Sequence, residues 1–335
     1  MVFNILKDGQ TILTASDTEF EQWMKQAFAT RLANFENKLL CYSPTAYPYK
    51  IPNHSQSTPH NFLSLSITGT SCSLNCEHCK GQLLKGMEST STPESLFNRC
   101  KEIKDLGGEG VLISGGSIST GHVPLERFGE TIRRVKKELD LLVVVHTGLV
   151  TPETARHLSE AGIDAAMLDI IGDTTVSENV YHIPDGPSKM RLSLDILEAH
   201  KVPTVPHVIV GLDYGSLKGE IEALDIISQG SPSALVIIVL TPIRGTSMKN
   251  VKPPSPMSIG RIMTIARLGF SNIPLLLGCA RPMGQHKIDT DLFAIKSGAN
   301  GVAMISQDGV DFAKSKGLEP VFRDVCCSLA FQELS

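Results

Sequence analysis

Three cysteines lie close together in the first quarter of the chain, at positions 72, 76 and 79, in the spacing C-x3-C-x2-C. Thiolates are soft ligands that suit iron–sulfur clusters, zinc and copper(I). A four-iron cube held at three corners keeps one iron free to bind another molecule, whereas a structural zinc site takes four protein ligands. His78 is the residue that could complete a zinc site. The count of three thiols favours the cluster, and zinc is the alternative.

This motif is the signature of the radical S-adenosylmethionine (SAM) enzymes, and the chain resembles that superfamily. The resemblance implies that Cys72, Cys76 and Cys79 hold a [4Fe-4S] cluster whose open iron binds SAM. It also implies a reductant such as ferredoxin or flavodoxin, whose electron splits SAM to methionine and a 5′-deoxyadenosyl radical. That radical abstracts hydrogen from an unactivated carbon, while the protein supplies binding, orientation and exclusion of water.

The elements that must position this motif follow a β–α alternation. An apolar run at 62–68 directly precedes the motif and indicates a strand. Further strands are expected at 111–114, 141–146, 165–171, 204–211, 234–240, 273–278 and 301–305. Helices lie between them, since Thr92-Pro93 and Thr151-Pro152 each place a capping hydroxyl before a proline in the first helical turn. The pattern predicts an α/β fold, a (β/α)8 TIM-type barrel.

The segments on either side of the barrel are shorter and differ in character. We expect residues 1–60 to form an N-terminal extension, with an amphipathic helix that starts at the capping box Ser16-Asp17-Thr18-Glu19. Residues 61–310 form the barrel. Residues 311–335 form a C-terminal tail that could fold over the barrel mouth.

Active sites of such barrels lie at the carboxyl ends of the strands, where polar residues gather in this sequence. By resemblance, Gly115 and Gly116 meet the SAM amino group through their backbone, although Ser117 replaces the glutamate of the family's Gly-Gly-Glu motif. Asp169 is expected to bind the ribose hydroxyls, and Gly211 to border the adenine. The predicted cofactor-binding set consists of these residues together with Ser114, His146 and His207. The alternative for the two histidines is that they are core or rim residues without a catalytic role.

Five further cysteines lie outside the motif. Cys100 shares an apolar helical face with Leu96 and Ile103, so we expect a buried structural thiol. The other four could hold a second, auxiliary [4Fe-4S] cluster if both ends of the chain fold over the mouth: Cys41, Cys279, Cys326 and Cys327. Ser328, Arg281 or an exogenous group could complete that site. The alternative is that these thiols are unrelated.

The resemblance extends to the biotin and lipoyl synthase branch. It is carried by 169–172, 180–182, 206–212, 241–246 and 277–282, and is strongest to the two-subunit lipoyl synthases of archaea and some anaerobic bacteria. The single-chain lipoyl synthases have a C-x4-C-x5-C motif that this chain lacks. The resemblance implies sulfur insertion into an octanoyl chain on a lipoyl-carrier protein, with a homologous second subunit. Alternatives are a small-molecule reaction of the biotin synthase, methylornithine synthase or hydrogenase-maturation type, and a non-catalytic metal-binding scaffold.

Composition and charge limit the kinds of partner that the sequence favours. The net charge is −4 at pH 7, so electrostatics favour neither nucleic acid nor an anionic membrane. The longest apolar runs are of strand length, and the first residues lack the pattern of a signal peptide. Eight cysteines with one tight cluster suit a reducing cytoplasm better than a disulfide framework.

Overall fold

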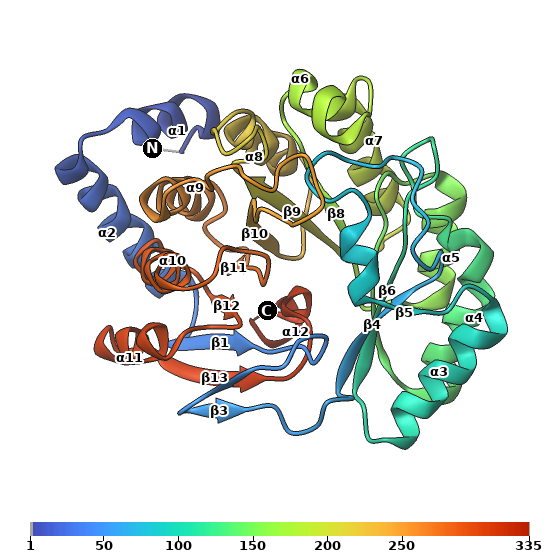
Figure 1. The fold of residues 1–335 in the computed structure, drawn as a ribbon. Coiled ribbons are helices and arrows are strands. Elements are labelled where there is room, and N and C mark those ends of the chain that lie inside the picture. The colour runs from blue at the N-terminus through green and yellow to red at the C-terminus, as the bar shows by residue number, and fades with distance from the viewer. Residues whose placement is uncertain (1–2, 335) are drawn as a thin grey trace.

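The protein is described by a computed structural model that covers residues 3–334. Met1, Val2 and Ser335, the outermost residues of the predicted extension and tail, lie outside the described residues. Eleven parallel strands form one curled sheet in the order β13-β1-β12-β11-β10-β9-β8-β7-β6-β4-β5 (Figure 1). Helices cover its outer face, so the predicted α/β barrel-type fold is confirmed.

The eight predicted strands all exist, each within a few residues of its expected bounds. They are β4 (Phe62–Ser66), β6 (Gly110–Ser114), β7 (Leu142–His146), β8 (Ala165–Asp169), β9 (Thr204–Val210), β10 (Leu235–Val239), β11 (Leu275–Leu277) and β12 (Gly301–Ala303). Both sides of the sheet are buried, which is why these strands appear in the sequence as continuous apolar runs.

Three more strands extend the sheet beyond the predicted eight. They are β1 (Lys38–Tyr42), β13 (Glu319–Arg323) and the two-residue β5 (Glu88–Ser89). β1 lies between β12 and β13, so part of the predicted extension and part of the predicted tail are strands of the sheet. Pro320 is tolerated because β13 is an edge strand.

The outer helices begin where the sequence places their caps. α2 (Asp17–Asn34) has the Ser16/Glu19 capping box, and α3 (Pro93–Asp105) and α5 (Pro152–Ala161) start after Thr92 and Thr151. The remaining helices are α1 (Ile5–Thr14), α4 (Gly129–Arg134), α6 (Thr174–Val176), α7 (Gly186–Ala199), α8 (Glu220–Ser228), α9 (Pro256–Gly269), α10 (Gln285–Lys296), α11 (Gln307–Ser315) and α12 (Phe331–Leu334). None in residues 3–334 is long and apolar enough to cross a bilayer.

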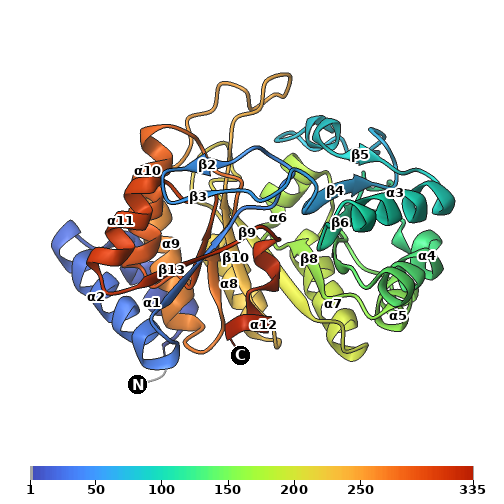
Figure 2. The same ribbon diagram turned by 90° about the horizontal axis from the view of Figure 1, so that it is seen from below.

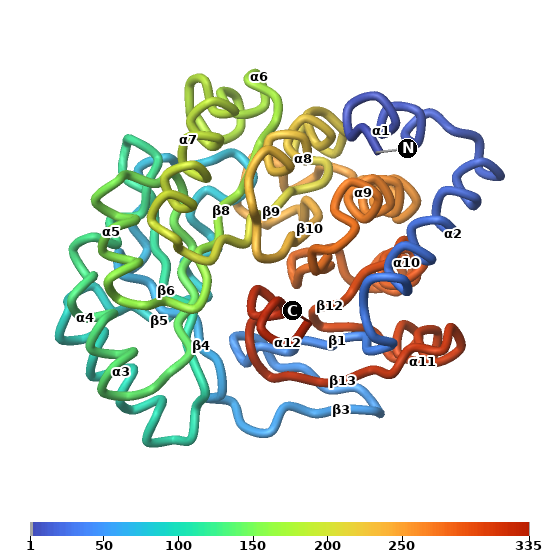
Figure 3. The backbone as a smooth tube through the Cα atoms, turned by 180° about the vertical axis from the view of Figure 1, so that it is seen from behind, coloured from blue at the N-terminus to red at the C-terminus, as the bar shows by residue number. Residues whose placement is uncertain are grey.

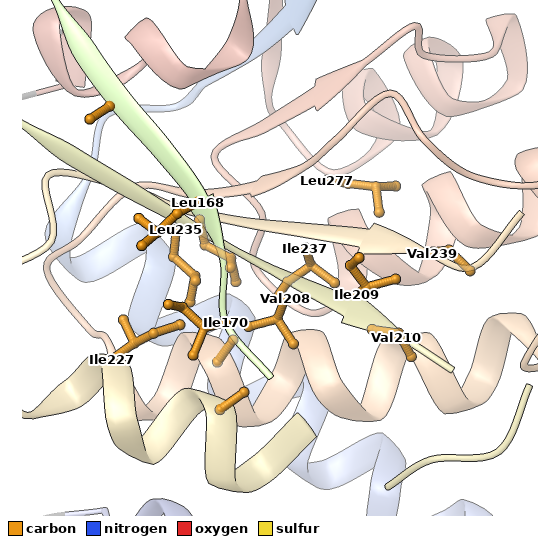
Figure 4. Close-up of a cluster of buried hydrophobic side chains, with 14 of the residues drawn as sticks. Leu168, Ile170, Val208, Ile209, Val210, Ile227, Leu235, Ile237, Val239 and Leu277 are labelled. Carbon is orange, nitrogen blue, oxygen red and sulfur yellow. The ribbon is translucent and has the colours of Figure 1, made fainter. Parts of the chain in front are cut away.

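The main core lies between the sheet and these helices. Figure 4 shows one part of it, where Leu168, Val208 and Ile237 from three neighbouring strands and Ile227 of α8 gather on one side of the sheet. Cys100 is fully buried on α3 beside Leu96 and Ile103, as expected for a structural thiol.

A second core lies inside the curl of the sheet, and the C-terminal tail fills it. Residues 325–330 pack there, and α12 lies within the curl (Figures 1 and 3). Small residues on the inner face, Ala165, Ala234 and Ala303, leave the room that this segment occupies. The view in Figure 2 shows α12 on the inner side of the sheet. The tail is therefore an internal element of the fold.

Candidate active site

The motif cysteines lie on the loop that follows β4. Cys76 is buried, while Cys72 and Cys79 are half-buried. The loop folds tightly because Asn75 and Lys80 adopt positive φ angles of 50° and 45°. The Lys80 amide donates a 2.8 Å hydrogen bond to the Cys76 carbonyl, which brings Cys76 and Cys79 to the same turn.

The segment Ser114–Ser117, at the carboxyl end of β6, packs against the motif loop. The Gly116 amide donates a 2.7 Å hydrogen bond to Oγ1 of Thr68, and the Ser73 amide donates one of 2.7 Å to the Ser117 carbonyl. A Cβ atom added at Gly116 would lie 1.9 Å from the Ser71 carbonyl oxygen and 2.6 Å from Cα of Cys72. Only glycine permits this approach of two backbones.

The motif thiols differ in their protonation. A hydrogen bond from Cys76 and the neighbouring His78 together lower the pKa of Cys79 to about 4, although burial opposes the shift. The same hydrogen bond and burial raise the pKa of Cys76. Cys79 is therefore a thiolate at neutral pH, the form that binds metal.

The donor set fits a [4Fe-4S] cluster, because such clusters are held by cysteine thiolates. Within residues 3–334 no three His, Cys, Asp or Glu side chains converge on a point that would hold a single metal ion. The ring of His78 stacks on Tyr181 with centroids 4.9 Å apart, and its buried Nδ1 has no hydrogen-bond partner. His78 thus offers an unused polar atom beside Cys79.

Polar side chains that are next to one another extend from the motif loop to the inner side of the sheet. The Tyr181 hydroxyl donates a 2.8 Å hydrogen bond to Oδ2 of Asp169, and Nε2 of His146 lies 3.6 Å from Oδ1 of the same carboxylate. The His146 and His207 rings are adjacent, with centroids 5.8 Å apart. The three predicted residues are therefore brought together, with His146 and Asp169 at the ends of β7 and β8 and His207 beside Asp169 in the middle of β9.

The charges in this group are set by burial and by each other. Burial and the neighbouring His146 lower the pKa of His207 to about 4. Burial acts to lower the pKa of His146 as well, but the Asp169 carboxylate outweighs it and the net shift is upward. The pKa of Asp169 is lowered although burial opposes it, because His146, His207 and Tyr181 stabilise the anion. A neutral His207 therefore faces an ionised Asp169 at neutral pH.

Two of the four remaining predicted thiols lie on the inner side of the sheet, and a third is among their electrostatic neighbours. Cys327 is part of the inner core, and Cys326 packs against it. A hydrogen bond from Cys327 lowers the pKa of Cys326 to about 7, with His146 contributing. Cys279 follows β11 and is exposed, and Cys326 is among the groups that act on it electrostatically. Cys279, Cys326 and Cys327 thus lie near one another and near His146.

Cys41 and Arg281 do not join this group. On β1, Tyr42 packs into the inner core and Cys41 into the outer one, because successive side chains of a strand point to opposite faces. Arg281 is buried in an ion pair with Asp291, at 2.8 Å between Nη2 and Oδ1. The prediction that Cys41 belongs to the second set is therefore wrong, because its side chain points to the outer face of the sheet.

The other predicted residues have structural partners. The Ser114 hydroxyl donates a 2.9 Å hydrogen bond to the His146 carbonyl. The Gly211 amide donates one of 2.8 Å to Oε1 of Glu220, and the φ angle of +82° at Gly211 requires glycine. Both residues hold the strand ends on which the predicted cofactor site depends.

Sequence reasoning missed four residues of this region: Tyr42, Tyr181, Glu220 and Asp324. Tyr42 is 1% exposed in the inner core, and its hydroxyl has no hydrogen-bond partner within residues 3–334. The Asp324 carboxylate accepts hydrogen bonds from Ser43, His54 and Ser57, which fixes the tail just before Cys326. In the sequence, the only sign of this anchor is that an aspartate lies two residues before a pair of cysteines.

No family model matches the chain. In sequence it is similar to the biotin synthase of Zymomonas mobilis, with 23% identity over 246 residues that span 71% of this chain and 72% of that protein. In fold it is similar to methylornithine synthase, with a TM-score of 0.68, 17% identity and coverage of 99% of this chain and 97% of that one. It is also similar to HydG, a maturase of the [FeFe]-hydrogenase, with a TM-score of 0.68, 13% identity and coverage of 97% and 73%.

These similarities agree with the thiol motif at the end of β4. Together they support placing the chain among the radical SAM enzymes, with a [4Fe-4S] cluster and SAM as the implied cofactors. The similarity to biotin synthase is one of sequence, whereas the similarity to the other two proteins is one of fold.

Proposed function

We propose that the protein is a radical SAM enzyme that inserts sulfur at an unactivated C–H bond, with the octanoyl chain of a lipoyl-carrier protein as its substrate. The observation that carries the proposal is the second thiol set. Cys326 and Cys327, from the tail, lie on the inner side of the same sheet whose β4 end carries the motif, and Cys279, which follows β11, acts electrostatically on both thiols. A second cluster held there would be a source of sulfide.

The roles of the chain's own residues follow from the geometry. Cys72, Cys76 and Cys79 would hold the first cluster, which supplies the electron that cleaves SAM. Gly115 and Gly116 would bring the backbone against the cofactor, and Asp169 would accept hydrogen bonds from the ribose. Tyr181 keeps Asp169 oriented, and the inner core excludes water from the floor of the site.

The partners in the proposal remain those that the family resemblance implies. One chain would insert one sulfur atom, so a homologous second subunit would insert the other, and ferredoxin or flavodoxin in the cytoplasm would supply electrons. A second candidate is a reaction on a small molecule. It is favoured by the sequence similarity to biotin synthase, which spans over two thirds of both chains.

The first test measures iron and labile sulfide per chain after anaerobic reconstitution of a Cys72/Cys76/Cys79→Ala variant. We expect about one four-iron cluster to remain, and we expect it to disappear when Cys279→Ala and Cys326→Ala are added. Cys41→Ala is the matched control, since Cys41 faces the outer core, and it should leave the remaining iron unchanged. Complete loss of iron in the triple variant would remove the second cluster from the proposal.

The second test addresses the substrate. The wild-type protein with reductant and SAM should form 5′-deoxyadenosine, and an octanoyl-lysine peptide should increase that yield and gain sulfur. Formation of 5′-deoxyadenosine without any effect of the peptide would favour the small-molecule candidate. Absence of 5′-deoxyadenosine under all conditions would favour a non-catalytic scaffold.

A further inference from the structure

The loops at the carboxyl ends of β1, β4, β10 and β11 contain basic residues and no acidic ones. These loops comprise residues 43–61, 80–87, 240–255 and 278–284, and none of them contains an aspartate or a glutamate. The whole chain, in contrast, has 35 acidic and 31 basic residues. The four loops, called the basic rim below, therefore differ in charge from the rest of the molecule.

Most of the lysines and arginines on the basic rim are exposed and unpaired. Lys80 pairs with Glu77 of the motif loop, and Arg281 is buried against Asp291. The others are exposed and have no ion-pair partner among the side chains that the structure describes: Lys50, Lys85, Arg244, Lys249 and Lys252. A surface that gathers charges of one sign attracts a partner of the opposite sign.

The loop after β10 contacts the motif loop and its continuation. The Ser247 hydroxyl donates a 3.1 Å hydrogen bond to the Glu77 carbonyl. A Cβ atom added at Gly245 would lie 3.6 Å from the side chain of Gln82, so residues 240–255 also lie against residues 80–87. The basic residues of these two loops therefore belong to one surface.

The loop after β1 adjoins the same surface from the other side. It contains the hairpin of β2 (Lys50–Ile51) and β3 (His54–Ser55), which lies at the same end of the sheet as β5 (Figure 2). A Cβ atom added at Gly86 would lie 3.5 Å from the Tyr47 hydroxyl. Residues 43–61 and 80–87 are thus in contact, and the basic rim extends from β1 past the motif to β10.

Exposed hydrophobic side chains lie among these charges. Tyr47, Leu83 and Met283, each on a different loop of the basic rim, are 54%, 51% and 75% exposed. Protein interfaces combine a few aromatic or methionine contacts with a polar rim. Single-stranded nucleic acids bind instead on several stacking aromatic rings, and Tyr47 is the one exposed aromatic residue of these four loops. The composition therefore favours a protein partner.

We propose that the basic rim is the docking surface for an acidic protein that carries the acylated lysine, with acidic residues on either side of that lysine. The inference rests on the proposed function, because the acyl chain has to enter at the carboxyl ends of the strands. The carboxylates of the carrier would face the exposed cations, and its apolar residues would contact Tyr47, Leu83 and Met283. Such charge complementarity speeds encounter and selects the partner.

The experiment measures the binding of two labelled octanoyl-lysine peptides to the reconstituted protein by fluorescence anisotropy. One peptide has aspartate and glutamate around the acylated lysine, and the other has asparagine and glutamine at the same positions. At low salt the acidic peptide should bind about tenfold more tightly. Its advantage should decline as the ionic strength rises to about 0.5 M, because salt screens exposed charges.

Two triple variants locate the effect. Lys85→Gln/Lys249→Gln/Lys252→Gln should remove most of the preference for the acidic peptide. The control removes exposed lysines of the outer helices α1, α2 and α3 instead, with the same change in net charge, and should keep the preference: Lys7→Gln/Lys25→Gln/Lys101→Gln. The melting temperatures of both variants should match that of the wild type, since the side chains are exposed.

The outcomes separate the docking surface from the proposed function. Failure of the acidic peptide to bind more tightly than the neutral one, or an equal loss in both triple variants, would overturn the docking surface. Tighter binding of a single-stranded oligonucleotide or of phosphatidylserine vesicles than of the acidic peptide would also overturn it. If the acidic peptide binds through the basic rim but neither increases 5′-deoxyadenosine nor gains sulfur, the octanoyl substrate is wrong while the docking surface stands. Conversion of both peptides with equal KM values would have the opposite meaning.

Discussion

The Tyr181 hydroxyl donates a 2.8 Å hydrogen bond to Oδ2 of Asp169, while the ring of the same tyrosine stacks on His78 between the motif cysteines. One side chain therefore connects the motif loop with the carboxylate expected to bind the ribose of SAM. It does so from the end of the short helical segment 174–181 that follows β8.

Replacing Tyr181 separates these two contacts. Tyr181→Phe keeps the ring but loses the hydrogen bond to a charged group, which should cost about 1.5–3 kcal/mol of unfolding free energy. The [4Fe-4S] content should stay near the wild-type value, while SAM binding weakens. Tyr181→Ala also loses the stacking on His78, so it should lower the iron content as well. Urea unfolding and iron analysis of both variants measure the difference, and equal iron contents would argue against a role for the stacked ring.

Gly116 should be intolerant of any side chain. An added Cβ would meet the Ser71 carbonyl and Cα of Cys72, so Gly116→Ala must displace the motif loop. Strain of this kind costs about 1–3 kcal/mol, and we expect the yield of 5′-deoxyadenosine to fall about tenfold or more. Gly86→Ala is the control, because its Cβ would meet only the Tyr47 hydroxyl, at an ordinary contact distance of 3.5 Å. Similar activities of the two variants would contradict the tight approach of the two loops.

Asp324 should control the position of the tail. Its carboxylate accepts hydrogen bonds from the Ser43 hydroxyl at 2.7 Å, from Nε2 of His54 at 2.8 Å and from the Ser57 amide at 3.0 Å. Asp324→Asn cannot accept all of these, and we expect a loss of about 2 kcal/mol. In the Cys72/Cys76/Cys79→Ala background the variant should also retain less iron. Retention of the full iron content would show that Cys326 and Cys327 are placed without this anchor.

Glu220 should make stability depend on pH. Burial raises its pKa to about 7, although the Gly211 amide opposes the shift. A carboxyl whose pKa is higher in the folded state stabilises the fold most below its unfolded pKa of about 4.5, and this contribution is lost as pH rises through 7. The loss amounts to at most about 3 kcal/mol.

Glu220→Gln removes this titration and still offers an oxygen to the Gly211 amide. Relative to the variant, the wild type should therefore lose stability between pH 5 and pH 7.5, as measured by urea unfolding. Glu178→Gln changes an exposed carboxyl that is not among the groups acting on Glu220 and serves as the control. Parallel stability profiles of wild type and Glu220→Gln across this range would contradict the raised pKa.

The sequence by itself determined the β–α alternation, the helix caps and the thiol motif, because these depend on local signals. Apolar runs of strand length indicate β4 and its successors, Thr92 and Thr151 start helices through their own hydroxyls, and C-x3-C-x2-C places three ligands on one loop. The expected meeting of Asp169, His146 and His207 also followed, since parallel strands end at the same edge of a sheet.

Only the tertiary structure decided which distant residues meet. β1 lies between β12 and β13, a place in the sheet that is set by its pairing with both strands. Cys41 and Tyr42 are neighbours in sequence, yet the alternation of β1 sends the thiol to the outer core and the phenol to the inner one. Cys326 and Cys327 approach Cys279 because small inner side chains admit the tail and Asp324 anchors it, and no local pattern of residues encodes that contact.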